Sequence, residues 1–378
     1  MNRRAPTHAR GRAAKSARPD LTVIMATKGR ARFVGEAIDS VRRQTLRNWR
    51  MLIVYGPSDD GALEILRTHA RADSRIELQP ERQSGYANVL NQAIAQVTTP
   101  FFILQEDDDL SHPERFAACL DAMQTNPQAD AIVPHCLHFE STPRRPSGPP
   151  HSFYPTLILG CFRTASFNRL GGFRSFFVAM FDLDLEYRWE DGGAQLVALA
   201  SILYFKRDHA DPYEHLHMRG NRCLEWFALH LTRWCGRHGR TDMLNPNVTH
   251  ADVSHIFQSL PKAAQKKLLQ EMFRYTKKSL ILAQAKNDYA RLKASFFAHM
   301  HDAFLQLGAS EYRTRLLLLQ LRIAIRKSLL TRRLRIAIRQ RRRPPLKLPH
   351  ETIDAWMQVA PHQVPAQERQ GWDMSEAA

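Results

Sequence analysis

The chain has 378 residues, of which 54 are Lys or Arg and 37 are Asp or Glu, so its formal net charge at pH 7 is +17. This length can bury a sizeable core and is typical of two structural units. No run of 18 apolar residues occurs, and the basic residues 1–19 lack the apolar core of a signal peptide, which argues against a membrane span and against secretion. Scattered cysteines, five in number, favour reduced thiols over a disulfide framework. We therefore expect a cytoplasmic protein.

The first hundred residues alternate between strand-like apolar runs and helical apolar spacing. The predicted order is a strand at 21–26, a helix through 33–41, a strand at 51–55, a helix from 63, a short strand at 76–78 and a helix through 90–97. Parallel strands joined by helices form a doubly wound sheet. The sequence therefore predicts an α/β fold.

An acidic cluster follows the next apolar run, Phe101 to Leu104. Residues 106–109 read Glu-Asp-Asp-Asp, and Ser111 with Pro113 predicts a helix N-cap and an early helical proline. Ligands bind at the carboxyl ends of strands in open α/β sheets, and carboxylate oxygens suit Mg²⁺ or Mn²⁺ when a diphosphate supplies the other ligands. This pattern favours a metal site. The alternative is a solvated acidic turn.

The order of four motifs resembles the family 2 glycosyltransferases, nucleotide-sugar-dependent enzymes with the GT-A fold. The motifs are LTVIMATKGRARFVGEAIDSVRRQT from Leu21, GYANVLN from Gly85, QEDDDLSHPERF from Gln105, and GGF from Gly171 followed by FDLDLEYR from Phe181. Each motif alone is weakly specific, but their order and spacing are specific. The resemblance covers about half of the chain, and it implies an α/β GT-A domain.

The resemblance implies a divalent cation, Mn²⁺ or Mg²⁺, and a nucleotide-sugar donor. The family's Asp-x-Asp motif aligns with Glu106 and Asp108, which makes Asp108 the expected metal ligand. Glu106 would hold the metal or the ribose, Asp107 would contact the donor, and Asp109 would support them. Glu106 departs from the family's usual Asp, and its longer side chain could alter metal affinity.

Residues expected to frame the nucleotide lie mostly in loops, and they are Thr27, Lys28, Arg30, Tyr55, Arg82, Gly85 and Asn91. The family's paired aspartates beside the nucleotide base are replaced here by Tyr55-Gly56, while Ser58 and Asp60 are retained. Tyr55 could stack on the base or pack as an ordinary strand residue. The basic side chains of Lys28, Arg30 and Arg82 could contact phosphates, or they could be exposed to solvent. A UDP-sugar is one candidate donor, and the base is left open.

The second functional motif is the segment from Phe181 to Arg188, preceded by Gly171-Gly172. In the family, the first acid of this motif is the base that deprotonates the acceptor hydroxyl, and it matches Asp182, with Asp184 and Arg188 at the expected steps. One displacement by an activated hydroxyl inverts the anomeric carbon. The alternative is that Asp182, Asp184 and Glu186 lie on an exposed helix face. Gly171-Gly172 could allow close backbone approach or form an ordinary turn.

The predicted domains are a disordered basic arm at 1–19, the GT-A domain at 20–215, a helical basic region at 216–345 and a tail at 346–378. Helical spacing covers 224–234, 261–285 and 290–307, and a Pro/Ser-rich loop covers 141–150. His209, His215 and His217 could suggest zinc, but they lack the ordered ligand pattern of zinc sites.

Between Arg313 and Arg343 the chain has twelve basic residues and no acid, interleaved with Leu and Ile. This pattern favours an anionic membrane surface, and the alternatives are a helix packed on the catalytic domain or a coiled-coil partner site. Nucleic-acid binding is not expected, because no recognised motif accompanies the charge.

The combined prediction is a metal-dependent, inverting glycosyltransferase that acts on a glycan or lipid-linked glycan in cell-surface polysaccharide biosynthesis, peripheral at the inner face of the membrane. The alternatives are a noncatalytic GT-A-like binding or scaffold protein, and a basic membrane- or nucleic-acid-binding adaptor.

Overall fold

The computed structural model describes residues 19–141, 144–147, 157–169, 171–178, 180–208, 222–245, 247–271, 274, 305, 307 and 352–363. Several predictions lie outside this part: most of the basic arm 1–19, the boundary at residue 216, most of the helices at 261–285 and 290–307, the histidines 209, 215 and 217, and the basic segment 313–343. Every helix among the described residues is too short or too polar to span a bilayer.

The predicted alternation of strands and helices in the first hundred residues is confirmed. The elements are β1 (Leu21–Thr27), α1 (Val34–Arg42), β2 (Trp49–Tyr55), α2 (Ala62–Ala72), β3 (Ile76–Pro80), α3 (Tyr86–Ile94) and β4 (Phe101–Leu104). Strands β3, β2, β1 and β4 lie in that order and are parallel, as the doubly wound prediction requires. Their carboxyl ends therefore meet at one edge of the sheet.

The rest of the chain extends this sheet and adds helices. The elements are β5 (Leu110–Ser111), α4 (Arg115–Thr125), β6 (Ala131–Glu140), the 3₁₀ turn η1 (Leu157–Leu159), β7 (Cys161–Arg163), α5 (Thr164–Arg169), α6 (Phe181–Asp191), β8 (Leu196–Asp208), α8 (Arg222–Arg237), η2 (Asp242–Leu244), α9 (His250–Gln258) and α14 (Ile353–Trp356), with residues 262–271 also helical. The complete strand order is β3-β2-β1-β4-β7-β6-β8-β5, and β7 and β5 run antiparallel to their neighbours.

The predicted N-cap at Ser111 is wrong. Ser111 belongs to strand β5, where it pairs with Tyr204 of β8, and helix α4 begins only at Arg115 after Glu114. The Ser111 hydroxyl donates to the side-chain oxygen of Gln105, and its N–H donates to the hydroxyl of Ser40. Pairing with a distant strand therefore overrides the local capping pattern.

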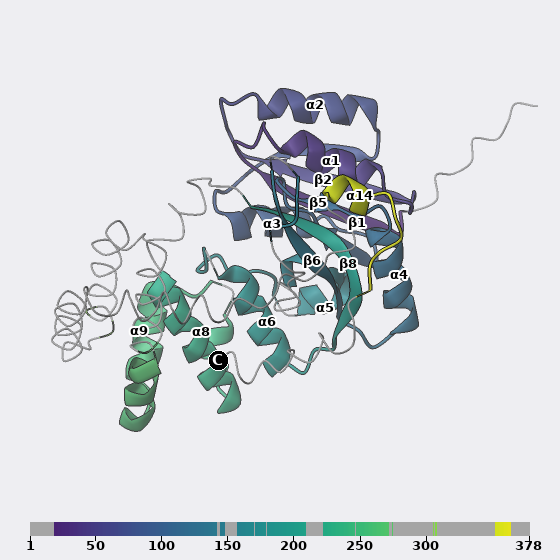
Figure 1. Cartoon of the computed structure of the whole chain (residues 1–378). Coiled ribbons are helices and arrows are strands. Elements are labelled where there is room, and N and C mark those ends of the chain that lie inside the picture. The colour runs from purple at the N-terminus through teal and green to yellow at the C-terminus, as the bar shows by residue number, and fades with distance from the viewer. Residues whose placement is uncertain are drawn as a thin grey trace, which may run out of the picture.

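Helices cover both faces of the sheet, so the domain has three layers (Figure 1). Strand β1 shows this directly, because its side chains alternate between two buried clusters. Leu21, Val23 and Met25 pack with helices α1 and α4 on one face. Ile24 and Ala26 pack with helices α3 and α6 on the other. The core is therefore built around the strands whose ends carry the acidic turn.

Two further clusters tie the carboxyl-terminal part to this domain. Helices α8 and α9 bury apolar side chains against Phe176, Phe177 and Met180, which precede helix α6. Residues 352–363 pack along the far edge of the sheet, where Trp356 is buried against Phe205 of β8. In Figure 1 the short yellow helix α14 lies beside the sheet, far in sequence from the strands it covers.

Candidate active site at the carboxyl edge of the sheet

Most of the predicted donor-site residues lie at the edge where the parallel strands end. Thr27 ends β1 and Tyr55 ends β2, while Lys28 and Arg30 follow β1, Arg82 and Gly85 follow β3, and Glu106, Asp107 and Asp108 follow β4. The structure therefore brings motifs that are distant in the chain, from Thr27 to Asp108, to one edge of the sheet. Their roles in binding stay predictions.

The acidic turn is largely buried, so the alternative of a solvated turn is wrong. Asp107 is 8% exposed and Asp109 is 1% exposed. Burial and the neighbouring Asp108 raise the pKa of both Glu106 and Asp107 to about 7, and they raise the pKa of Asp109 well above its ordinary value. Crowded buried carboxylates of this kind are stabilised by nearby positive charge.

Arg30 supplies part of that charge from the loop after β1. Its Nε lies 3.8 Å from Asp107 Oδ1, and its terminal Nη2 lies 3.6 Å from Asp108 Oδ2. Both distances are longer than a close ion pair, and the Asp108 side chain keeps 17% of its surface exposed. Arg30 thus faces two carboxylates of the turn, and the Asp108 side chain is partly exposed at the sheet edge.

The donor set suits a hard divalent cation. Asp108 and Glu106 offer only carboxylate oxygens, and Mg²⁺ is commonly held by one or two carboxylates together with substrate phosphates. Among the described residues no three His, Cys, Asp or Glu side chains form a complete cage. A cation at this turn would take its remaining ligands from water or from the phosphates of a bound molecule.

Arg207 of strand β8 fixes the acidic turn from behind, and sequence reasoning missed it. Its Nε donates to the carbonyl of Asp108 at 2.7 Å, and its N–H donates to Asp109 Oδ1, also at 2.7 Å. The guanidinium lies between the rings of Phe33 and Phe139, 5.0 and 4.8 Å from their centroids. The sequence around Arg207 gives no local signal of these contacts, because every partner is distant in the chain.

The loops after β1, β2 and β3 are held together by short-range contacts. Lys28 Nζ lies 3.9 Å from Glu81 Oε1, and a Cβ on Gly56 would lie only 2.9 Å from the Lys28 side chain. Glycine at position 56 therefore allows the loops to approach closely. Tyr55 is half-buried at the end of β2, and its ring packs partly against the neighbouring core. Arg82 and Gly85 are exposed.

The retained Asp60 has a structural role in these loops. Its Oδ2 accepts the N–H of Ala31 at 2.8 Å, and its Oδ1 accepts the hydroxyl of Ser58 at 2.9 Å. These hydrogen bonds lower the pKa of Asp60, although burial opposes them as the largest single influence. Asp60 therefore joins the loop after β2 to the start of the segment that leads into α1.

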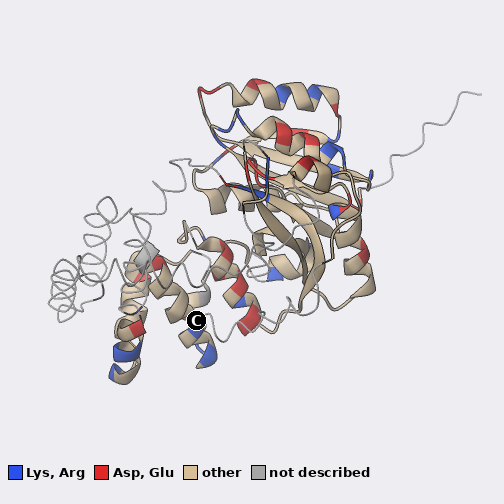
Figure 2. Cartoon of the chain, viewed as in Figure 1, with Lys and Arg blue, Asp and Glu red and all other residues tan. Residues whose placement is uncertain are grey.

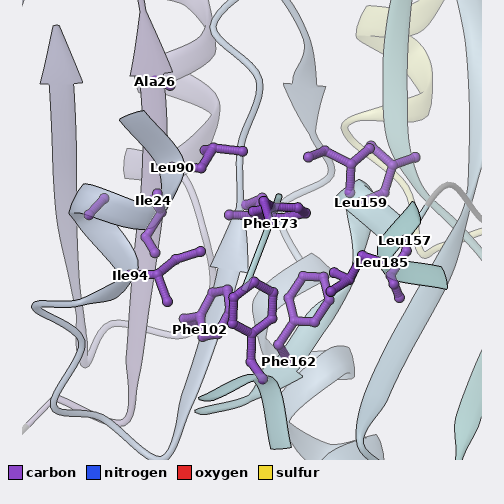
Figure 3. Packing of buried hydrophobic residues seen from close by; sticks show 14 of the residues in the cluster. Ile24, Ala26, Leu90, Ile94, Phe102, Leu157, Leu159, Phe162, Phe173 and Leu185 are labelled. Carbon is purple, nitrogen blue, oxygen red and sulfur yellow. The ribbon is translucent and has the colours of Figure 1, made fainter. Parts of the chain in front are cut away.

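Asn91 joins helix α3 to the Gly171-Gly172 loop. Its amide forms hydrogen bonds with both backbone groups of Phe173, and a Cβ on Gly172 would lie 2.8 Å from Asn91 Oδ1. Figure 3 shows Phe173 buried in the core cluster with Leu90, Phe102 and Phe162. The glycine pair is therefore a close backbone approach, with φ of 79° and 74°. Any effect of Asn91 on the donor would act through this loop.

Tyr86 connects the acidic turn to the helix that carries Asp182. Its hydroxyl donates to Glu106 Oε1 at 2.7 Å, and its ring lies 5.3 Å from the ring of Phe181. Phe181 is the residue before Asp182, in the first turn of α6. The predicted metal motif and the predicted base are therefore linked through two aromatic side chains. Tyr86 lies within the motif that begins at Gly85, but the motif pattern does not predict a separate role for it.

The alternative of an exposed acidic face on α6 is wrong for two of its three members. Asp184 is fully buried and Glu186 is 4% exposed, while Asp182 is half-buried. Asp184 pairs with Arg174 and, at 3.1 Å, with Arg188 of the same helix. The remaining acidic residues of α6 lie toward its carboxyl end (Figure 2). Asp184 and Arg188 therefore form a buried ionic network rather than a solvated surface.

Comparisons with known proteins agree with this geometry. The model of glycosyl transferase family 2 matches residues 22–184. EpsE of Bacillus subtilis (strain 168), named as a glycosyltransferase, is 27% identical over 210 residues, which are 52% of this chain and 76% of EpsE. TuaG of the same organism, named as a teichuronic acid biosynthesis glycosyltransferase, is 25% identical over 121 residues, 32% of this chain and 48% of TuaG.

A solved structure supports the fold. S. aureus TarS 1–349 in complex with UDP-GlcNAc superposes with a TM-score of 0.52 at 14% identity, covering 85% of this chain and 92% of that chain. At this identity the likeness concerns the fold alone. The matched family domain spans both the acidic turn and the start of helix α6. Residues 22–184 of this chain therefore match family 2 of the glycosyltransferases, and the chain has the GT-A fold.

Proposed function

We propose that this glycosyltransferase is metal-dependent and inverting, and that it moves a sugar from a nucleoside diphosphate donor to a hydroxyl of a glycan or lipid-linked glycan. The observation that carries the proposal is the connection of the acidic turn to Asp182 through Tyr86 and Phe181. A sugar transferase needs a donor site and a base on opposite sides of one anomeric carbon. The contacts of Tyr86 with Glu106 and Phe181 support a site in which the two motifs provide both.

On the donor side, Asp108 and Glu106 would hold a divalent cation between the protein and the diphosphate. Such a cation neutralises charge that develops on the leaving diphosphate. Arg30 faces Asp107 and Asp108 and is positioned to meet phosphate oxygens beside them. Lys28 and Arg82 extend from neighbouring exposed loops, and Tyr55 presents an aromatic ring at the end of β2. Donor phosphates would thus be bound by loops after three adjacent strands.

On the acceptor side, Asp182 would take the proton of the acceptor hydroxyl. The oxygen then bonds to the anomeric carbon, the bond to the diphosphate oxygen breaks, and the nucleoside diphosphate leaves with the bonding electrons. A positioned carboxylate base contributes about 10²- to 10⁴-fold to such a step. Because a single displacement occurs, the configuration of the anomeric carbon inverts.

The acceptor class is proposed as a cell-surface glycan. The name of the relative TuaG refers to teichuronic acid biosynthesis, which supports this class without identifying the acceptor. Basic residues interleaved with aliphatic ones at 313–343 lie outside the described residues, and their composition supports attachment to an anionic membrane surface where a lipid-linked acceptor would reside. This would make the protein peripheral at the inner face of the membrane.

The test is turnover of a panel of donors with water as the acceptor. UDP-GlcNAc, UDP-glucose, GDP-mannose and dTDP-glucose are each incubated with the full chain in Mn²⁺ or in EDTA, and released nucleoside diphosphate is measured. We expect release from one donor class, only with the cation, and a loss of about 10²-fold or more in Asp182→Asn. Glu190→Gln, on the same helix, is the matched control and should keep the rate. A noncatalytic scaffold protein would release nothing from any donor.

A further inference from the structure

Helix α8 runs beside the helix that carries Asp182, and it lies outside the family-matched residues 22–184. Residues from the start to the end of α8 contact, in the same order, residues from the start to the end of α6. Glu225 of α8 contacts the segment that enters α6, Arg233 pairs with Glu190 at 3.1 Å, and a Cβ on Gly236 would lie 3.4 Å from Asp191 at the end of α6. The helices are therefore parallel neighbours over the whole length of α6.

The first of these contacts involves a buried carboxylate. Glu225 is 1% exposed, its Oε1 accepts the N–H of Val178 at 3.1 Å, and its Oε2 accepts the N–H of Met180 at 3.0 Å. Met180 is the N-cap residue of α6, and Asp182 follows two positions later in the first turn. Both oxygens of Glu225 are thus used to hold the backbone that leads directly into the proposed base.

Packing of Phe176, Phe177 and Met180 holds part of this segment, but it does not hold Val178. The Met180 side chain makes no capping hydrogen bond to α6, and the side chain of Val178 is 48% exposed. Val178 is therefore fixed by its N–H rather than by packing. Hydrogen bonds from N–H groups to a carboxylate are about twice as strong as neutral ones, and buried N–H groups that lose a partner carry the full desolvation cost.

A second contact anchors α6 further along. Arg174 pairs with Asp184, and the same guanidinium donates to Thr232 of α8 at 3.0 Å and to the carbonyl of Met243. Glu225 therefore holds the residue before α6, and Arg174 holds the first turn of the helix through Asp184. Helix α8 acts as the rigid support that both anchors share.

We propose that Glu225 is a positioning residue that sets the orientation of Asp182 toward the acceptor. This inference rests on the proposed function of Asp182 as the base. Displacement of a reacting group by about 1 Å can cost on the order of 10²-fold in rate. Loss of the anchor should therefore reduce the chemical step while leaving the donor site, which lies at the ends of β1 to β4, unchanged. Sugar transfer in this chain then depends on a helix outside the matched family domain.

The experiment compares Glu225→Ala and Glu225→Gln with Asp130→Asn in the full chain. Asp130 is the matched control, because its carboxylate is also buried, at 9% exposure, and accepts a backbone N–H, that of Gln195 at 2.8 Å. For each variant we measure kcat and KM for the donor that the wild type hydrolyses, the Kd of the corresponding nucleoside diphosphate with Mn²⁺, and the melting temperature. The double variant Asp182→Asn with Glu225→Ala completes the set.

We expect Glu225→Ala to lower kcat by about 10- to 100-fold with KM and Kd unchanged within twofold. Glu225→Gln keeps one acceptor oxygen and should recover part of the rate. Asp130→Asn should lower the melting temperature similarly but keep kcat. In the Asp182→Asn background, Glu225→Ala should cause no further loss, because the positioned group is already absent.

Two other results would overturn the inference in distinguishable ways. Equal kcat values for Glu225→Ala and Asp130→Asn, with Asp182→Asn inactive, would show that Glu225 has only a structural role while the base assignment stands. Full activity of Asp182→Asn, or no turnover by the wild type, would remove the proposed function itself and the inference with it.

Discussion

The side-chain amide of Asn91 forms two hydrogen bonds with the backbone of Phe173: Nδ2 donates to the carbonyl at 2.6 Å, and Oδ1 accepts the N–H at 3.0 Å. Asn91 belongs to α3, beside the proposed donor site. Phe173 follows the Gly171-Gly172 pair, in the segment that leads to helix α6 and the proposed base Asp182. One amide thus holds the two halves of the proposed site at a fixed separation, although the partners are 82 positions apart.

Replacing Asn91 by Asp should be destabilising, because a carboxylate oxygen would then face the Phe173 carbonyl in place of a donor. The expected loss is about 1–3 kcal/mol of unfolding free energy, measured by urea denaturation. Asn88→Asp is the control on the same helix, since its amide bonds the Ser84 carbonyl at an exposed position. Equal losses for the two variants would contradict the role assigned to the Asn91 amide.

The adjacent glycines give a second test with its own control. Gly171 and Gly172 both have positive φ, but a Cβ on Gly171 meets no atom within 4 Å, whereas a Cβ on Gly172 lies 2.8 Å from Asn91 Oδ1. Gly171→Ala should lower the free energy of unfolding only by the strain of a left-handed alanine, roughly 1 kcal/mol. Gly172→Ala should lower the free energy of unfolding clearly more. Adding Asn91→Ala should relieve part of the Gly172→Ala loss but none of the Gly171→Ala loss. Chemical denaturation of the four variants measures this.

Asp184 should be the most costly carboxylate of α6 to neutralise. Its oxygens pair with the buried guanidinium groups of Arg174 and Arg188, so Asp184→Asn would leave two buried cations without an opposite charge. Breaking a buried ion pair from one side typically costs about 3–5 kcal/mol. Asp191→Asn, at the exposed end of the same helix, should change stability by less than about 0.5 kcal/mol. Similar melting temperatures for both variants would contradict the network.

Glu186 should make stability depend on pH. Burial, followed by the charges of Asp182 and Glu190, raises its pKa from 4.5 to about 8. The folded protein keeps this proton to higher pH than the unfolded chain does, so the stabilisation is fully present below about pH 4.5 and is lost as the pH rises through about 8.

Glu186→Gln carries no titrating proton, so its stability relative to wild type should rise by on the order of a few kcal/mol between pH 5 and pH 8. Urea denaturation at both pH values measures the difference. Asp191→Asn, exposed at the end of the same helix, should follow the wild-type dependence. Parallel curves for Glu186→Gln and wild type would show that the folded protein does not hold this proton.

Sequence reasoning reached the alternation of strands and helices and the doubly wound sheet of the first half because local signals were strong there. Apolar runs such as Phe101 to Leu104 end in acids or loop residues, and the alternation of β1 between two core clusters follows from its pattern. It failed at Ser111, where pairing with Tyr204 decides the conformation. Local capping preferences cannot anticipate pairing of Ser111 with Tyr204, which is distant in the chain.

The alternative of an exposed acidic face on α6 is wrong for a related reason, because contacts with distant segments bury this helix. The acidic sequence of α6 is typical of a solvent-exposed helix. In the fold, however, α8 covers α6 and Arg174 neutralises Asp184. Arg207 and Glu225 were missed likewise, since their partners at Asp109 and Met180 are distant in the chain. The motif residues could be named from the sequence, whereas the side chains that hold them in place required the fold.

In the proposed donor site, Asp108 binds a nucleoside diphosphate through a divalent cation. Calorimetric titration of UDP, GDP, dTDP and CMP into the full chain, with and without Mn²⁺, tests it most directly, with Asp108→Asn and the exposed Asp121→Asn compared in parallel. We expect Mn²⁺-dependent binding of one nucleotide, at least about 10-fold weaker in Asp108→Asn and unchanged in Asp121→Asn. Binding that ignores both the cation and Asp108→Asn, or no binding of any nucleotide, would contradict it.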